Sequence, residues 1–505
     1  MSNQAETSQE KTTEPLKPAP TDHLIETQHQ ITIGDQPIAY QVVTGTIVLK
    51  EESEKIGEAE GEKAKASVFF IAYIRTDVAA AARPITFSFN GGPGASSVWL
   101  HLGALGPRRV QLDDVGNLPP PPYQLTDNAY SLLDMTDLVF IDPVSTGYSR
   151  AVPGENAKEF HTFKKDIESV GDFIRLYTTR YRRWLSPKFL IGESYGTMRA
   201  AGLSGYLQER HGLYLNGIML VSSILNFGTT DAQPGNDLPY ILYLPTYAAT
   251  AWYHGSGRGA GRYQKDLRKL LIEVEEFAVT DYTTALMRGA TLSAKGRARI
   301  LDQLSKFTGL AADYLERVNL RIEIMRFTKE LLRGQRKTIG RLDSRFTGID
   351  RDAGGELPEN DPSYSNIAGP YTAAFYDYVR GDLKFESDLP YEALNSKANA
   401  QWKFEEHENR YVDVAETLRK AMTLNPHLKV FVANGYFDLA TPYFATAYTF
   451  NHLGLDASLR ANVSMGYYEA GHMLYVHQPS LAKLKQDLVK FMQSALPAVA
   501  APATE

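Results

Sequence analysis

The sequence contains no cysteine among its 505 residues, which excludes disulfide bonds, thiolate catalysis and cysteine-ligated zinc. No apolar run approaches the roughly 18 residues that a membrane-spanning helix requires. Neither sign of charge is in large excess, since the sequence has 53 Lys and Arg residues and 59 Asp and Glu residues, which gives a formal net charge of −6. Without a strong basic field, we expect neither nucleic acid nor a membrane as a partner.

The N-terminus lacks a basic segment followed by an apolar one, so no secretory signal is visible. We therefore expect a cytoplasmic location, with a periplasmic or secreted location as the alternative if a signal has been removed. No His-x-x-x-His pair is present either, so no metal and no other cofactor are expected. With 43% hydrophobic residues, the chain is able to bury a large core.

Ser194 lies in a Gly-x-Ser-x-Gly motif, between an apolar run and a helix-like stretch. In α/β-hydrolases a serine in this context occupies a strained strand-to-helix turn, which raises its hydroxyl above the sheet. Gly192 and Gly196 lack a Cβ and so permit the close packing that the turn needs. The motif alone is common by chance, but this context makes Ser194 a candidate nucleophile.

A serine nucleophile needs an imidazole to accept its proton and a carboxylate to orient that imidazole. Asp438 and His472 each follow a predicted strand, in the Ser, acid, His order of α/β-hydrolases. Taken alone, Asp438 is more typical of a turn or a helix cap, and a lone histidine of the surface or the core. Because carboxyl ends of neighbouring parallel strands meet at one rim, their order and placement together favour a triad.

A glycine-rich loop begins at Asn90, directly after a predicted strand, and reads Asn-Gly-Gly-Pro-Gly. A phosphate-binding loop is the other interpretation, but no Gly-Lys-Ser/Thr follows. A tetrahedral intermediate needs two N–H donors for its oxyanion. In α/β-hydrolases one donor is the residue after the nucleophile, here Tyr195, and the other comes from such an earlier loop.

Strand and helix patterns on both sides of the midpoint predict an α/β-hydrolase fold with a mainly parallel central sheet flanked by helices. The middle of the chain is mostly charged helix with Gly-, Asp- and Pro-rich links, and we expect it to be an inserted helical cap over the catalytic face. The predicted segments are a disordered tail at 1–25, core at 26–226, the cap at 227–425, core at 426–496 and a flexible tail at 497–505.

These motifs resemble those of the serine carboxypeptidases, a family of α/β-hydrolase exopeptidases. Since the chain has no cysteine, the resemblance is to a disulfide-free, bacterial-type member of that family. The matching segments are 90–97, 105–107, 140–149, 192–196, 434–442 and 470–473. The resemblance implies removal of C-terminal residues from peptides through an acyl-enzyme. Ser194 would be the nucleophile, His472 the base and Asp438 its orienting partner.

The resemblance also implies two binding sites. Gly92 and Tyr195 would donate backbone N–H groups to the oxyanion. Asn90, Gly91 and Glu193 would receive the terminal carboxylate of the substrate. Glu193 donates to a carboxylate only when it carries a proton, and a second carboxyl close by would raise its pKa.

The chain departs from the family at Ala104, where relatives commonly have a second glutamate. The carboxyl pair is therefore expected to be incomplete, which weakens the case for carboxylate recognition and for an acidic pH optimum. Arg108, Arg109 and Arg199 are candidate cations to take its place, although surface arginines without such a role are the more common case. An esterase or acyltransferase with the same triad is the first alternative function, and a catalytically silent binding protein of this fold is the second.

Overall fold

The computed structural model describes residues 20–55, 58–80, 83–256 and 266–496. The tail expected at 497–505 lies outside these residues, and so does most of the tail expected at 1–25. The exception is its last part, since strand β1 begins at His23. That residue is ordered by pairing with Thr46 on the next strand.

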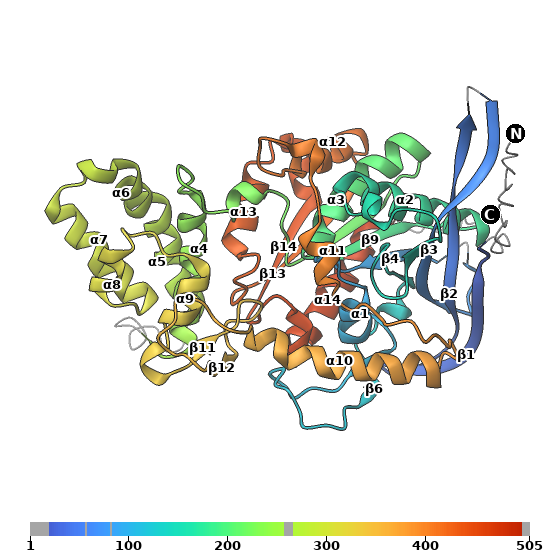
Figure 1. Cartoon of the computed structure of the whole chain (residues 1–505), viewed down its shortest axis with the longest axis horizontal. Coiled ribbons are helices and arrows are strands. Elements are labelled where there is room, and N and C mark those ends of the chain that lie inside the picture. The colour runs from blue at the N-terminus through green and yellow to red at the C-terminus, as the bar shows by residue number, and fades with distance from the viewer. Residues whose placement is uncertain (1–19, 56–57, 81–82, 257–265, 497–505) are drawn as a thin grey trace, which may run out of the picture.

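One large sheet organises the core (Figure 1). Its strands, in spatial order, are β1 (His23–Ile33), β2 (Gln36–Lys55), β3 (Glu58–Arg75), β7 (Asp137–Ile141), β4 (Ile85–Phe89), β9 (Lys188–Glu193), β10 (Gly217–Val221), β13 (Lys429–Gly435) and β14 (Val463–Tyr468). The first three strands and β7 pair antiparallel, and every pair from β7 to β14 is parallel. The mainly parallel sheet predicted from the sequence is therefore confirmed.

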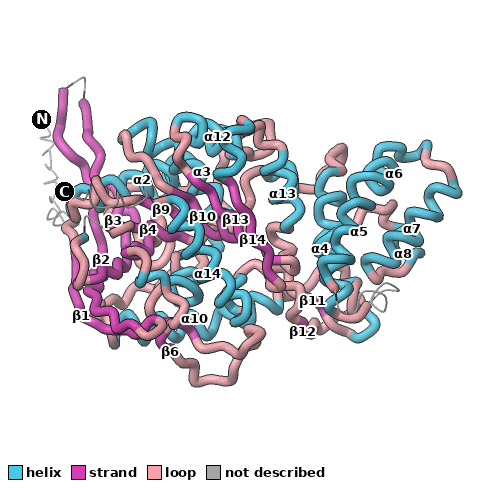
Figure 2. Tube along the Cα trace, turned by 180° about the vertical axis from the view of Figure 1, so that it is seen from behind, coloured by secondary structure: helices cyan, strands magenta, loops and turns pink. Residues whose placement is uncertain are grey.

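Helices cover both faces of this sheet (Figure 2). One face packs against α2 (Phe163–Arg180), α3 (Tyr195–His211) and α12 (Ala415–Leu424), and the other against α1 (Val98–Leu100), α10 (Pro362–Gly381) and α14 (Gln478–Ala495). Strand β9 shows the alternation, since Phe189 and Ile191 contribute to one hydrophobic cluster and Leu190 to the other. Parallel strands covered on both faces are apolar throughout, which is why these strands were visible as short apolar runs.

The expected cap at 227–425 consists of two parts. The first part forms a helical body with its own hydrophobic core, which lies beyond α13 (Tyr443–Asn451) in Figure 1. Its helices are α4 (Leu238–Tyr253), α5 (Leu267–Phe277), α6 (Thr283–Arg288), α7 (Ala294–Thr308), α8 (Ala312–Arg317) and α9 (Ile324–Glu330). The second part returns to the sheet, because α10 and α12 bury their apolar residues in the two clusters of the core.

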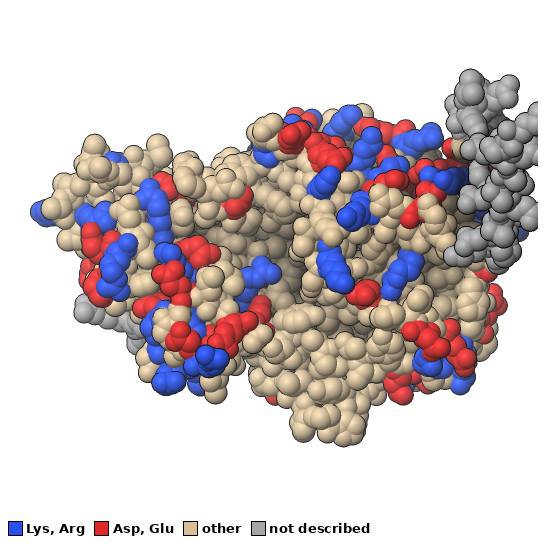
Figure 3. Space-filling view, in the orientation of Figure 1, with Lys and Arg blue, Asp and Glu red and all other residues tan. Residues whose placement is uncertain are grey.

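Short elements connect these layers. They are β5 (Arg108–Val110), β6 (Leu125–Asp127), β8 (Arg150–Ala151), β11 (Thr338–Ile339), β12 (Thr347–Gly348) and α11 (Ser396–Ala400). Of these, β8 also pairs antiparallel with β3 and so belongs to the large sheet. On the face shown in Figure 3, basic and acidic side chains are interspersed, and the surface is hollowed between the helical body and the core. Among the helices described, none combines the length and the apolar character needed to cross a membrane.

Candidate active site

Ser194 lies between β9 and α3 in a backbone conformation that few residues with a side chain adopt. Its φ is 60° and its ψ is −130°, a strain that costs on the order of 1–3 kcal/mol. Glycines make this turn possible: a Cβ on Gly192 would lie 2.1 Å from the carbonyl oxygen of Gly196, and one on Gly196 would lie 2.9 Å from that of Asn90. The strand–turn–helix geometry expected around Ser194 is present at the carboxyl edge of the sheet.

The glycine-rich loop packs directly on this turn. A Cβ on Gly91 would lie 2.5 Å from the backbone nitrogen of Tyr195, so only glycine allows the approach. Gly92 has a φ of 101°, which residues with a Cβ rarely adopt. Tyr195 is the first residue of α3, and a helix leaves its first N–H groups without intrahelical partners. The two segments predicted to bind an oxyanion therefore lie against each other.

His472 and Asp438 form a buried hydrogen-bonded pair, with Nδ1 of the imidazole 2.8 Å from Oδ2 of the carboxylate. The other carboxylate oxygen accepts from the backbone N–H groups of Ala440, at 2.8 Å, and Thr441, at 3.0 Å. The Thr441 hydroxyl donates to Oδ2 at 2.7 Å. These donors hold the carboxylate in one orientation.

Burial alone would lower the pKa of the His472 imidazole, but the charge and hydrogen bond of Asp438 outweigh it. The Glu193 carboxyl adds to this effect, and the pKa of His472 is raised above its ordinary value. A proton arriving on His472 is therefore stabilised by the carboxylate behind it, as a general base requires.

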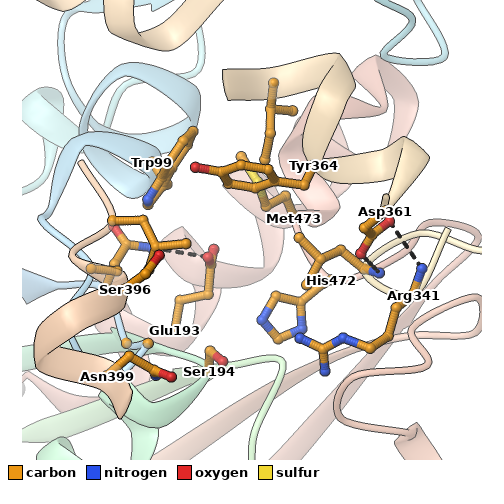
Figure 4. A pocket seen from close by; sticks show the side chains of 17 residues that line it. Trp99, Glu193, Ser194, Arg341, Asp361, Tyr364, Ser396, Asn399, His472 and Met473 are labelled. Carbon is orange, nitrogen blue, oxygen red and sulfur yellow. Dashed lines mark hydrogen bonds between the residues drawn. The ribbon is translucent and has the colours of Figure 1, made fainter. Parts of the chain in front are cut away.

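Ser194 and His472 line the same pocket, and Figure 4 shows the serine below the imidazole ring. Among the described residues the Ser194 hydroxyl and the His472 ring form no hydrogen bond within 3.5 Å. Such contacts are often long without substrate and shorten when the substrate binds. The structure thus brings the three predicted triad residues to one rim. The hydrogen bond between Asp438 and His472 is formed, and the one between His472 and Ser194 is not.

The two side chains expected to bind a terminal carboxylate contact each other beside Ser194. The Asn90 amide donates to Oε1 of Glu193 at 2.9 Å, while its own oxygen accepts from the Leu100 N–H at 3.0 Å. The other carboxyl oxygen of Glu193 is buried and forms no hydrogen bond of good geometry among the described residues, although the Tyr475 hydroxyl lies close enough to lower the pKa of this carboxyl. Glu193 is one of the residues that line the pocket.

Burial raises the pKa of Glu193 to about 7, although the charges and dipoles of His472, Tyr475 and Asn90 partly offset it. From the sequence, a second carboxyl was expected to raise the pKa of Glu193, and Ala104 stands in its place. The structure provides the shift without one, chiefly through burial of the carboxyl, with a smaller contribution from the charge of Asp438. Glu193 is therefore protonated below about pH 7.

Aromatic side chains pack against Gly103, the residue that precedes the position of the second glutamate. Ala104 is buried in a π-helical turn at 101–105. A Cβ on the preceding Gly103 would lie 2.4 Å from the Tyr475 ring and 2.6 Å from the Tyr371 hydroxyl. Both tyrosines lie close enough to Glu193 for its charge to raise the pKa of their hydroxyls, after the larger effect of burial. Two buried phenol groups, rather than a second carboxyl, therefore lie near Glu193.

The candidate cations suggested by the sequence are wrong, since Arg108, Arg109 and Arg199 do not line the pocket. Arg199 is completely buried beneath it, with its Nε 2.8 Å from the Asp166 carboxylate. One of its nitrogens donates to the backbone oxygen of Asn90 at 2.5 Å. Arg199 therefore holds the glycine-rich loop in place and does not contact the pocket.

The pocket has a volume of about 370 Å³. Its lining residues are Asn90, Gly91, Gly92, Ala95, Trp99, Glu193, Ser194, Arg341, Leu342, Asp361, Tyr364, Ile367, Leu394, Ser396, Asn399, His472 and Met473. Nearly half come from the insertion, which has no recognisable motif, so nothing in the sequence marked Tyr364 or Arg341 as pocket residues. Trp99 lies outside the insertion, in α1 after the glycine-rich loop. Within the described ranges, no group of three His, Asp or Glu side chains is placed to hold a metal ion.

Comparison with known proteins finds that residues 52–241 match the family model of serine carboxypeptidases. Serine carboxypeptidase-like 8 from Arabidopsis thaliana is 24% identical over 157 residues, which cover 30% of this chain and 34% of that protein. Serine-type carboxypeptidase F from Aspergillus niger is 32% identical over 120 residues, 21% of either chain. This chain thus spans about a third or less of the length of these relatives. The resemblance stated from the motifs is confirmed.

The fold is shared with a solved structure over most of its length. A prohormone-processing carboxypeptidase from Saccharomyces cerevisiae, Kex1(Δ)p, matches with a TM-score of 0.55 and covers 90% of this chain and 91% of its own. Sequence identity between the two is 16%, so the likeness concerns the fold alone. Together with the sheet order, it confirms the α/β-hydrolase fold.

Proposed function

We propose that this protein is a serine-type carboxypeptidase, which removes the C-terminal residue of a peptide through an acyl-enzyme. The observation that carries the proposal is the pairing of two sites in one pocket. Ser194 and His472 supply nucleophile and base, and Asn90 and Glu193 supply donors for a carboxylate beside them. The match to the serine carboxypeptidase family model supports the same conclusion.

In this mechanism the Ser194 hydroxyl attacks the carbonyl of the last peptide bond while His472 accepts its proton. Asp438 stabilises the imidazolium that forms. The N–H groups of Gly92 and Tyr195 stabilise the oxyanion, an interaction whose loss typically costs about 10²–10³ in rate. His472 then protonates the leaving amine, and water hydrolyses the acyl-enzyme in the second half of the reaction.

The terminal carboxylate of the substrate is bound by the Asn90 amide, the Gly91 N–H and the protonated Glu193. Trp99 and Tyr364 form an aromatic edge-to-face pair at this end of the pocket, with ring centroids 6.3 Å apart. Apolar walls favour an apolar side chain on the residue that leaves. We therefore expect peptides ending in Phe or Leu to be better substrates than peptides ending in Asp or Lys.

A pair of matched substrates tests the proposal. We expect a blocked dipeptide with a free C-terminal carboxylate to be hydrolysed at least about tenfold faster than the same dipeptide as its amide. The reason is that the amide offers no negative charge to the donors around Glu193 and leaves a buried polar site poorly paired. Release of the C-terminal residue, followed by chromatography, gives kcat/KM for both substrates.

Short acyl esters provide the control for this measurement. Ester turnover with no cleavage of either peptide would favour the esterase or acyltransferase instead, which the alanine at position 104 supports. No turnover of any substrate, and no labelling of Ser194 by an organophosphonate, would favour a silent binding protein.

The pH dependence of binding follows from Glu193. Its pKa of about 7 keeps it protonated, and able to donate to the substrate, at lower pH. As the pH rises through about 7 it becomes charged and repels a carboxylate, so KM for a free-acid peptide should increase. In Glu193→Gln the side chain donates at every pH, and we expect the increase above pH 7 to disappear. Measuring KM between pH 5 and 9 for both proteins tests this, and the same rise in the variant would exclude Glu193 as its cause.

A further inference from the structure

One cation in the pocket has no role in the proposed mechanism. Arg341 lies in the segment between β11 and β12, and its guanidinium extends beside the His472 ring in Figure 4. The residue is exposed, and its side chain makes no hydrogen bond or ion pair among the described residues. Its positive charge acts on the imidazole, because it is one of the influences that lower the pKa of His472.

The backbone of Arg341 is fixed to the catalytic loops. Its N–H donates to the Asp361 carboxylate at 3.1 Å, and its carbonyl oxygen accepts from the N–H of Leu439, next to Asp438, at 3.1 Å. The carbonyl oxygen of the following residue, Leu342, accepts from the N–H of His472 at 2.6 Å. The base of the arginine side chain is therefore held in a constant position relative to the triad.

The carboxylates around Arg341 already have other partners. Asp361 accepts from the N–H groups of Arg341, Leu342 and Ser363 and caps the first turn of α10. Asp438 is bound to His472 and to its own loop. The guanidinium is thus left to bind an anion that enters the pocket.

The position of Arg341 within the pocket indicates which anionic group of the substrate it would bind. In Figure 4, Glu193 lies on one side of the His472 imidazole and Arg341 on the other. If the terminal carboxylate binds at Glu193, as the proposed function requires, the leaving residue occupies that side. The acyl part of the peptide then extends from Ser194 toward Arg341.

We propose that Arg341 determines specificity for an acidic side chain on the penultimate residue of the substrate, the residue whose carbonyl is attacked. This inference rests on the proposed function and adds the substrate class. Guanidinium and carboxylate groups form charge-assisted, often bidentate hydrogen bonds, which makes arginine suited to this role. Because the site is exposed, the gain is moderate, about fivefold in kcat/KM for Glu over the neutral isostere Gln.

The test uses four blocked dipeptides that end in Phe and differ only in the preceding residue, which is Glu, Gln, Leu or Lys. The wild-type protein should prefer Glu over Gln about fivefold, and the preference should fall at high salt, as expected for an exposed charge pair. In Arg341→Gln we expect this ratio to fall to about one, with cleavage of the Gln and Leu peptides nearly unchanged. Arg341→Glu should reverse the preference toward Lys.

Arg351→Gln is the matched control, because it removes an exposed arginine from the same insertion away from the pocket. Equal rates for Glu and Gln in the wild type, or an unchanged ratio in Arg341→Gln, would overturn the inference and leave the carboxypeptidase proposal standing. An equal loss on all four peptides in Arg341→Gln would also overturn it, since it would place the arginine at the terminal carboxylate. If none of the four peptides is cleaved, it is the proposed function that fails.

Discussion

Replacing Ser194 with alanine is expected to lower kcat by about 10⁴-fold to 10⁶-fold, the range found when the nucleophile of a serine hydrolase is removed. No other hydroxyl is expected to take over, because the strained turn and its two glycines place Ser194 at the rim, whereas Ser396, another serine that lines the pocket, lies on α11. Hydrolysis of a free-acid peptide, measured with enough enzyme to detect the residual rate, gives the ratio. Organophosphonate labelling, detected by mass spectrometry, should be lost in the same variant.

Measuring the free energy of unfolding of the Ser194 variants shows whether a loss of activity comes from the missing nucleophile or from a damaged fold. Alanine carries a Cβ and keeps the strain at φ 60°, so the free energy of unfolding should change little. Ser194→Gly should be equally inactive and no less stable, because glycine adopts this φ without strain. Ser204→Ala, which removes a buried hydroxyl further along α3, serves as the control that keeps its activity. Activity in Ser194→Ala near that of wild type would remove this residue from the mechanism.

The candidate catalytic rim was predictable from the sequence because its geometry is local and depends on glycines. Gly192, Gly196 and the loop after Asn90 mark positions where a Cβ would overlap the backbone, and such positions are readable as motifs. Asp438 and His472 were found in a different way, by their order and by their position after strands. Both signals depend on the parallel sheet, which short apolar runs indicate clearly.

The side of the pocket that the insertion forms was not predictable, for a physical reason. Trp99 lies in a helix next to a known loop, but Tyr364 and Arg341 enter from an insertion whose path over the core no periodicity encodes. Residue charge alone gave a wrong prediction for Arg199. An arginine is suited to bind a carboxylate of the substrate, but this one lies fully buried against Asp166. The pKa of Glu193 depends on dehydration, which is a property of the packed site rather than of any neighbour in the sequence.

Asp438→Asn is expected to lower kcat by about 10³–10⁴-fold. The hydrogen bonds around this side chain determine how the asparagine amide would be oriented, and this orientation explains the loss. The N–H groups of Ala440 and Thr441 both donate to one oxygen of the carboxylate. An asparagine at this position must keep its carbonyl oxygen there, which turns its amide NH₂ toward Nδ1 of His472. The imidazole must then accept at Nδ1 and carry its proton on Nε2, the nitrogen that should receive the proton of Ser194.

Two measurements distinguish this tautomer effect from general damage to the site. Removing the negative charge should lower the pKa of His472, so the rise of residual activity with pH should move to lower pH. Thr441→Val removes a second donor to the same carboxylate but keeps the charge, and we expect its loss of kcat to be only about tenfold. A similar loss in both variants, with no displacement of the pH profile in Asp438→Asn, would assign Asp438 a purely structural role. The triad would then reduce to Ser194 and His472.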